Sequence, residues 1–324
     1  MNGAFVISLD FELHWGIRDK AALDGATARR MRATRQVVDE LLTRFEGAGV
    51  AATWATVGFL FAGRRQDLEA HRPQRTPSYP RAALDAYAET VGDDEASDPA
   101  HYGRSLVERI RRTPRQEIAT HTYSHYYCLD AADGAGADAF DADLASAVAI
   151  AADMDVTLRS IVFPRNQVKR ECLAALPRHG IRTYRGNAAL GGPGASSGRL
   201  SQALHRGLRF ADAYLPLTGS QAYPFEEIVE GPGPRNVRAS MFLRAHYPER
   251  GALGALHRAR IMRNMRQAAR EGRVFHLWWH PHNFADQPER CFAVLDTILD
   301  EYARLRDAHG FRSLTMDEAA DAAG

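Results

Sequence analysis

The chain has 324 residues, of which 45% are hydrophobic and 25% are charged. This composition is typical of a soluble globular protein. The formal net charge is only +1, which argues against a protein that binds nucleic acid through phosphate contacts. Because no apolar run approaches the roughly 18 residues needed to cross a bilayer, we expect no transmembrane segment.

The N-terminus and the cysteines predict a cytoplasmic protein. Residues 1–10 contain no basic region and end on an acid, Asp10, unlike a secretory signal peptide. The three cysteines, Cys128, Cys172 and Cys291, are widely spaced and odd in number. This pattern favours reduced thiols in a reducing compartment over a disulfide framework or a cysteine-based metal site.

Hydrophobic periodicity predicts strands that alternate with helices along the whole chain. In chain order we expect a strand at 4–9, a helix at 27–46, a strand at 50–56, helices at 81–89 and 100–112, a strand at 116–120, a helix at 138–154, a strand at 157–163, a helix at 169–179, a strand at 181–184, a helix at 252–271, a strand at 274–279, a helix at 289–307 and a strand at 311–316 followed by a terminal helix. This alternation predicts an α/β fold, a single barrel-like (β/α) domain over residues 1–324. The irregular stretches at about 64–100 and 186–250 are expected to be insertions, the second of which helps to shape a substrate site.

Four polar clusters follow predicted strands. They are Asp10 with Glu12, His121 with His125, Pro164-Arg165-Asn166, and His280 with His282. The carboxyl ends of the strands in a parallel α/β barrel open on one face, where catalytic groups gather. We therefore expect these four clusters to meet.

His121 and His125 are four residues apart, a spacing that places both rings on one face of a helical turn. Asp10 and Glu12 are two apart, so on a strand they point to the same side. Two imidazoles and one carboxylate can hold a divalent cation and leave a position open for water. The alternative is that the two histidines are ordinary surface residues of a helix.

Several motifs resemble those of the polysaccharide deacetylase family, the NodB-homology carbohydrate esterases. Ser8-Leu9-Asp10-Phe11-Glu12 resembles the family's first motif, and Ala52 to Gly58 resembles the strand that follows it. His121-Thr122-Tyr123-Ser124-His125 matches the H-[ST]-x-x-H metal motif, and Leu277-Trp278-Trp279-His280 matches the late L-x-x-H motif. The resemblance implies a distorted (β/α) barrel of the NodB-homology type, with insertions.

The resemblance also implies roles for individual residues. Asp10 would be the catalytic base toward a metal-bound water, Glu12, His121 and His125 would hold the metal, and His280 would be the general acid. The metal would be zinc, with cobalt or manganese as alternatives.

The chain departs from the family pattern at three places. Glu12 stands where an aspartate is usual, which leaves open whether Asp10 is the metal-binding carboxylate instead. The family's arginine precedes the proline of the third motif, whereas here Arg165 follows Pro164. We expect Arg165 to reach Asp10 from this different place and to keep it ionised. The fourth motif has no counterpart.

Substrate binding is assigned to polar and aromatic residues beside the motifs. The candidates are Trp15, Tyr126, Asn166, Trp279, His282 and Asn283, and for Tyr126 and Trp279 packing in the core is an equal alternative. His14 and His282 are rivals for the roles given to the other histidines. The basic helix expected at 252–271 is interpreted as a solvated outer helix, with peripheral membrane contact as the less favoured alternative.

The sequence therefore predicts a metal-dependent amide hydrolase that acts on C–N bonds outside peptides. It would remove an N-acyl group, most simply acetyl, from an amino sugar or a small cytoplasmic sugar conjugate. One alternative is a non-catalytic carbohydrate-binding protein on the same fold. Another is a metal-dependent deformylase, or an amidase that opens a small cyclic amide, acting on a substrate other than a sugar.

Overall fold

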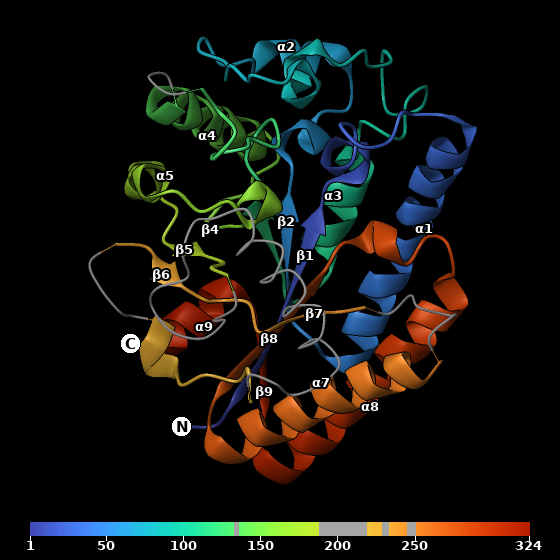
Figure 1. Cartoon of the computed structure of the whole chain (residues 1–324), viewed down its shortest axis with the longest axis vertical. Helices are drawn as coiled ribbons and strands as arrows, with labels where there is room; N and C mark the ends of the chain where they lie inside the picture. Colours follow the sequence, from blue (N-terminus) through green and yellow to red (C-terminus); the bar gives the residue numbers. More distant parts are fainter. Residues whose placement is uncertain (133–135, 188–218, 229–232, 245–250) are drawn as a thin grey trace, which may run out of the picture.

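The computed structural model describes residues 1–132, 136–187, 219–228, 233–244 and 251–324. In this part of the chain, one parallel sheet of nine strands forms the centre of the molecule (Figure 1). The strands are β1 (Ala4–Phe11), β2 (Ala52–Thr56), β3 (Gln116–Thr120), β4 (Ser160–Ile161), β5 (Thr183–Tyr184), β6 (Arg235–Asn236), β7 (Met241–Phe242), β8 (Val274–Trp279) and β9 (Arg312–Leu314). Their order is β6-β5-β4-β3-β2-β1-β8-β7, and β9 pairs with β1 at its start.

Helices cover the sheet, and Figure 1 shows α1 and α8 next to each other along one side. The helices are α1 (Gly25–Ala48), α2 (Arg65–Ala70), α3 (Arg104–Arg112), α4 (Gly136–Ala152), α5 (Arg170–Ala175), α7 (Gly251–Glu271), α8 (Pro288–His309) and α9 (Met316–Ala322). Among the helices of the described residues, none has the length and the apolar composition that crossing a bilayer requires.

The central strand β1 divides the core into two parts through its alternating side chains. Phe5, Ile7 and Leu9 belong to a large apolar cluster that also contains residues of the outer helices α1, α7 and α8. Ala4 and Val6 point the other way, into a smaller cluster enclosed by the curled sheet. Asp10 continues the inward-facing series, which explains how a carboxylate reaches the interior.

Residues 237–240 close the curl of the sheet. They join β6 to β7, which lie at opposite ends of the strand order. The Ala239 amide donates to the Gly186 carbonyl just after β5 (2.9 Å), and the next amide, that of Ser240, donates to the His276 carbonyl in β8 (2.9 Å). The result is an incompletely closed barrel, so the predicted distorted (β/α) barrel is confirmed.

The pairing register places the polar clusters at one level. Asp10 is level with Ala55, Ala55 is level with Ala119, and Leu9 is level with Trp279. His280 is therefore level with Asp10, and Glu12 and His121 lie two residues further along their own strands.

Local predictions fail where tertiary contacts decide the conformation. The helix expected at 81–89 is two short 3₁₀ turns, Ala82–Leu84 and Ala86–Ala88. The strand expected at 157–163 is shortened to β4, and α2 lies unpredicted in the first insertion. In the second insertion, β6 and β7 lie in described residues, and the rest of the prediction for 186–250 falls largely outside them.

Candidate active site

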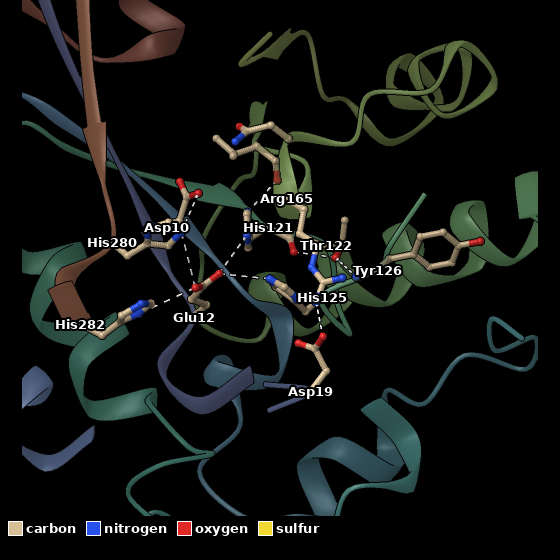
Figure 2. A network of polar contacts seen from close by, with 12 residues as sticks. Asp10, Glu12, Asp19, His121, Thr122, His125, Tyr126, Arg165, His280 and His282 are labelled. Carbon is tan, nitrogen blue, oxygen red and sulfur yellow. Dashed lines mark hydrogen bonds and ion pairs between the residues drawn. The ribbon is translucent and has the colours of Figure 1, made fainter. Parts of the chain in front are cut away.

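The carboxylate of Glu12 lies between two pairs of histidines (Figure 2). Glu12 Oε2 is 3.1 Å from His125 Nε2 and 3.4 Å from His121 Nε2. Glu12 Oε1 is 3.6 Å from His280 Nε2 and 3.8 Å from His282 Nδ1. The structure thus brings together all three residues predicted to bind a metal, and His280 lies beside them.

The hydrogen bonds of His121 leave one ring nitrogen free, so that a cation could be held between the two rings and Glu12. His121 Nδ1 must donate to the Val162 carbonyl (2.8 Å), because a carbonyl carries no proton. In a neutral ring His121 Nε2 is then a bare lone pair, and it has no hydrogen-bond partner among the described residues. It faces a carboxylate oxygen, and two electron-rich atoms at this distance repel each other. A divalent cation would satisfy both.

The ionisation of the neighbouring groups fits the same conclusion. Burial lowers the pKa of His125 to about 4, against the opposing effect of Glu12, so its ring is neutral as a metal ligand must be. Burial raises the pKa of Glu12, but the nearby His280, His121 and His125 more than offset this and hold it well below its usual value. One carboxylate and two imidazoles match the ligand set of catalytic zinc sites.

The loop from His121 to His125 is not helical, so the prediction of a helical turn is wrong. Thr122 (φ 65°) and His125 (φ 58°) adopt left-handed backbone conformations, which are costly for residues with side chains. The buried carboxylate of Asp143 on α4 holds the loop, accepting from the amides of Tyr123 (2.7 Å) and Ser124 (3.1 Å). The two rings therefore converge through a strained, fixed loop.

Gly16 makes room for the Glu12 carboxylate. It ends the 3₁₀ turn Leu13–Gly16 that directly follows Glu12. A Cβ on Gly16 would lie 1.9 Å from Glu12 Cδ and 2.0 Å from Oε1. Only a residue without a side chain lets the turn pack against the carboxylate in this way.

Asp10 forms a buried ion pair with Arg185, a residue not predicted to belong to the site. Arg185 Nη1 donates to Asp10 Oδ1 (2.7 Å) and Nη2 to Asp10 Oδ2 (2.9 Å). Arg185 is 0% exposed, and its guanidinium lies over the ring of Trp278. Burial raises the pKa of Asp10, but Arg185, His280 and His121 together more than offset this and leave the pKa below its usual value. Asp10 is therefore a carboxylate at neutral pH.

A hydrogen-bond chain supports Arg185 from below. Arg185 Nη1 also donates to Ser8 Oγ (2.9 Å), and Ser8 Oγ lies 2.8 Å from His276 Nε2. His276 Nδ1 donates to the Val237 carbonyl (3.1 Å), so Nε2 accepts the proton of Ser8. Burial, followed by the charge of Arg185, lowers the pKa of His276 to about 3 and keeps this ring neutral.

His280 stands at the accessible edge of the site. Its side chain is 24% exposed, and its Nε2 lies 3.6 Å from Asp10 Oδ2. The side-chain oxygen of Asn283 accepts from the His280 amide (3.4 Å) and so helps to fix the start of the loop after β8. A group at this edge can exchange a proton with a bound molecule.

Arg165 does not reach Asp10, so the prediction that it keeps Asp10 ionised is wrong. Its guanidinium pairs with Asp19 and lies 4.2 Å from the ring centroid of Tyr127. Arg165 itself has a left-handed backbone (φ 56°), and its pairing with Asp19 takes the side chain away from Asp10. Arg185 is the first residue after β5, so the rule that found the other clusters also applies to it.

Three of the proposed substrate-binding aromatics lie in the core instead. Trp279 is 0% exposed and Tyr126 is 1% exposed, with the first packed against Phe45 and the second against Phe140. Trp15 is also buried and borders a separate cavity of about 310 Å³ formed mainly by residues 65–91. Core packing therefore accounts for these three rings, and substrate binding by them stays a prediction.

The remaining candidates do adjoin the site. Asn166 accepts from Arg185 Nη2 (2.9 Å), and Asn283 contacts the backbone of His280. His282 is buried, and burial lowers its pKa to about 3. Binding of substrate by these three residues stays a prediction. His14, considered as a rival ligand, pairs with His101 instead of Glu12.

The sequence matches no protein-family model and no curated protein at a significant level. Solved structures do match it over nearly its whole length. A protein from Mycobacterium smegmatis, assigned as a polysaccharide deacetylase, has a TM-score of 0.60 at 14% identity, covering 100% of this chain and 91% of the other. The chain has the fold of the polysaccharide deacetylases.

Two further structures with this deacetylase fold have the same TM-score, 0.53, at 11% identity. One is a probable polysaccharide deacetylase from Pseudomonas aeruginosa PAO1, with 98% of this chain and 89% of the other covered. The other is Puue allantoinase, with 98% and 88% covered. The predicted resemblance is confirmed for the fold, and function has to be argued from the site because one fold hosts several chemistries.

Proposed function

We propose that the chain is a metal-dependent hydrolase that removes an N-acyl group, most simply acetyl, from an amino sugar or a small sugar conjugate. The observation that carries the proposal is the meeting of Glu12, His121 and His125 beside the Asp10–Arg185 pair and His280. A divalent cation held by Glu12, His121 and His125 would lower the pKa of water and polarise the acyl carbonyl.

The protein's own groups would supply the two proton transfers. Asp10 is kept anionic by Arg185 and can accept the proton of the attacking water. His280, at the accessible edge, can deliver a proton to the departing amine. Proton-transfer groups of this kind typically contribute about 10²–10⁴ in rate each. The bidentate contact with Arg185 also fixes the direction in which Asp10 accepts.

The location and the size of the substrate belong to the same proposal. The odd number of widely spaced cysteines supports a reducing compartment, and so a cytoplasmic protein. A small glycoside, or a nucleotide-linked or lipid-linked amino sugar, is therefore the expected substrate class. The cation is expected to be zinc, with cobalt and manganese able to replace it.

The test is a substrate panel assayed with the protein loaded with zinc, cobalt or manganese in turn. N-acetylated amino sugars should release acetate, and His121→Ala should release none while its circular dichroism spectrum stays that of the wild type. Tight sugar binding with no turnover under any of the three ions would instead support a non-catalytic carbohydrate-binding protein.

A second candidate is a metal-dependent amidase whose substrate is not a sugar. The shared fold with an allantoinase, at a TM-score of 0.53, favours keeping this candidate. The same ligand set and the same proton-transfer groups would serve it. Formylated amines and a small cyclic amide in the same panel separate it from the leading proposal, because only the preferred class should be turned over.

A further inference from the structure

Two buried histidines outside the candidate active site face each other. His14 lies in the 3₁₀ turn that follows Glu12, and His101 precedes α3. His14 Nδ1 is 3.0 Å from His101 Nε2, and both side chains are 1% exposed. Both atoms at this contact are ring nitrogens, so a hydrogen bond between them needs a proton on one of the two.

In each ring the outer nitrogen, the one that points away from the other histidine, already carries the proton of a neutral imidazole. His14 Nε2 donates to the Ala21 carbonyl (3.0 Å), since a carbonyl cannot donate. His101 Nδ1 donates to the carboxylate of Asp98 (2.7 Å), which also accepts from the Gly92 amide (2.8 Å). A neutral imidazole has one N–H, so the inner nitrogens present two lone pairs to each other. Such a contact requires a cation between them.

A third ligand distinguishes a metal ion from a shared proton. Ligand atoms of His14, Glu89 and His101 all lie within 4.8 Å of one another. A shared proton needs only the two nitrogens, whereas two imidazoles and a carboxylate form a common zinc ligand set. The outer bonds to a carbonyl and a carboxylate are also those that orient metal-bound histidines. We propose that His14, Glu89 and His101 form a second metal site, which takes a divalent cation of the zinc class.

The dimensions of the cluster agree with this assignment. Two nitrogens on one tetrahedral zinc, each at roughly 2.0–2.1 Å, stand roughly 3.3 Å apart. The observed 3.0 Å separation therefore needs only a small opening of the two rings. The carboxylates of Glu89 and Asp98 supply two negative charges near the pair, which match the charge of one divalent cation.

The second site joins two parts of the chain that are far apart in sequence. Glu89 and His101 come from the first insertion and its end, and His14 comes from the turn that packs against Glu12 through Gly16. Trp15 strengthens the same junction, because its indole N–H donates to the His101 carbonyl (2.8 Å). The cation would fasten the insertion to the turn beside the candidate active site, in a structural role that does not depend on the proposed function.

The experiment counts zinc equivalents by elemental analysis of the full chain after dialysis against metal-free buffer. The wild type should retain two equivalents, and His101→Gln and His121→Ala should retain one each. Glu89 is partly exposed, so Glu89→Gln is expected to fold normally. This variant tests the site even if the histidine variant fails to fold. Because loss of even an outer-shell partner costs about 10–100-fold in metal affinity, this variant should bind the second equivalent at least about tenfold more weakly. His179→Gln, which removes a histidine paired with Asp141, should keep both equivalents.

The outcomes separate the two metal sites. One equivalent in the wild type that is lost in His101→Gln and kept in His121→Ala supports the second site and contradicts the proposed function. One equivalent that is lost in His121→Ala and unchanged in both His101→Gln and Glu89→Gln overturns the second site, and a shared proton then bridges His14 and His101.

Discussion

Arg185 binds the carboxylate of Asp10 through both terminal nitrogens, at 2.7 and 2.9 Å, with both residues buried. The pair links the end of β5 to the end of β1, which are not neighbours in the sheet. It couples the fold to the proposed chemistry, because the same contact that spans the barrel also keeps Asp10 anionic.

Removing this arginine should therefore cost stability as well as activity. Arg185→Met leaves Asp10 as an unpaired buried charge, which typically destabilises a protein by about 3–5 kcal/mol. We expect a loss of this size in urea unfolding at neutral pH. The double variant Asp10→Asn/Arg185→Met removes the stranded charge and should regain most of the stability without regaining activity. Equal destabilisation of the single and double variants would show that the ion pair is not the cause.

A methyl group at Gly16 should weaken metal binding without touching a ligand. In Gly16→Ala the new Cβ would overlap the Glu12 carboxylate, at 1.9–2.4 Å from its atoms. The carboxylate must then move away from His121 and His125, and we expect at least about a tenfold loss of affinity for zinc by calorimetry. The matched control is Gly47→Ala in α1, where no atom lies within 4 Å of the added Cβ. If both variants bind zinc as the wild type does, Gly16 has no part in placing Glu12.

The carboxylate that holds the metal-motif loop should make stability depend on pH. Burial raises the pKa of Asp143 to about 6 from 3.8, so the folded state holds this proton more tightly than the unfolded state. The stabilisation from the protonated Asp143 is complete below pH 3.8, the pKa of this group in the unfolded chain. It is lost as the pH rises to about 6, the pKa in the folded protein. The shift corresponds to about 3 kcal/mol. Relative to Asp143→Asn, the wild type should lose up to about this much unfolding free energy between pH 4 and 6, and a difference that is constant with pH would refute the assignment.

The hydrogen-bond chain beneath Arg185 should contribute through Ser8. The Ser8→Ala change removes the hydroxyl that Arg185 Nη1 and His276 Nε2 both contact. Leaving buried polar groups without a hydrogen-bond partner typically costs about 1–3 kcal/mol of stability. Zinc stoichiometry should stay as in the wild type because no ligand is changed. Thr43→Ala, at an exposed hydroxyl on α1, serves as the control and should change stability by no more than about 0.5 kcal/mol. Thermal or urea unfolding of the two variants makes the comparison.

The site residues that could be predicted from the sequence are those at the carboxyl ends of parallel strands, which open on one face of the barrel. Asp10 lies near the end of β1, whereas Glu12, His121 and His280 directly follow strands. Parallel pairing brings these strand ends to one level. The same rule reaches Arg185, but β5 is only two residues long and its end carries no motif. Arg165 looked better placed because it adjoins a proline motif, and only the left-handed backbone of Arg165 and Asn166 (φ 56° and 53°) and the ion pair with Asp19 reveal where it lies.

The core position of Trp279 could have been predicted from the sequence. His276, Trp278 and His280 alternate along β8 and its end, so they share one side, and Trp279 faces the other. Trp278 accordingly lies against Arg185 and His280, and Trp279 packs in the outer core. The pairing of His14 with His101 is different in kind. No local pattern connects residues 87 positions apart, so only the folded chain shows it.

The most direct test of the proposed hydrolase is to measure the rate of acetate release while cobalt is added stepwise to metal-free protein, with an N-acetylated amino sugar as substrate. We predict that activity rises from zero as cobalt occupies the site formed by Glu12, His121 and His125, and that it reaches a plateau when the site is full. The His121→Ala variant should stay inactive at every cobalt concentration. A metal-free protein as active as the loaded one, or a His121→Ala variant with the wild-type rate, would contradict the account.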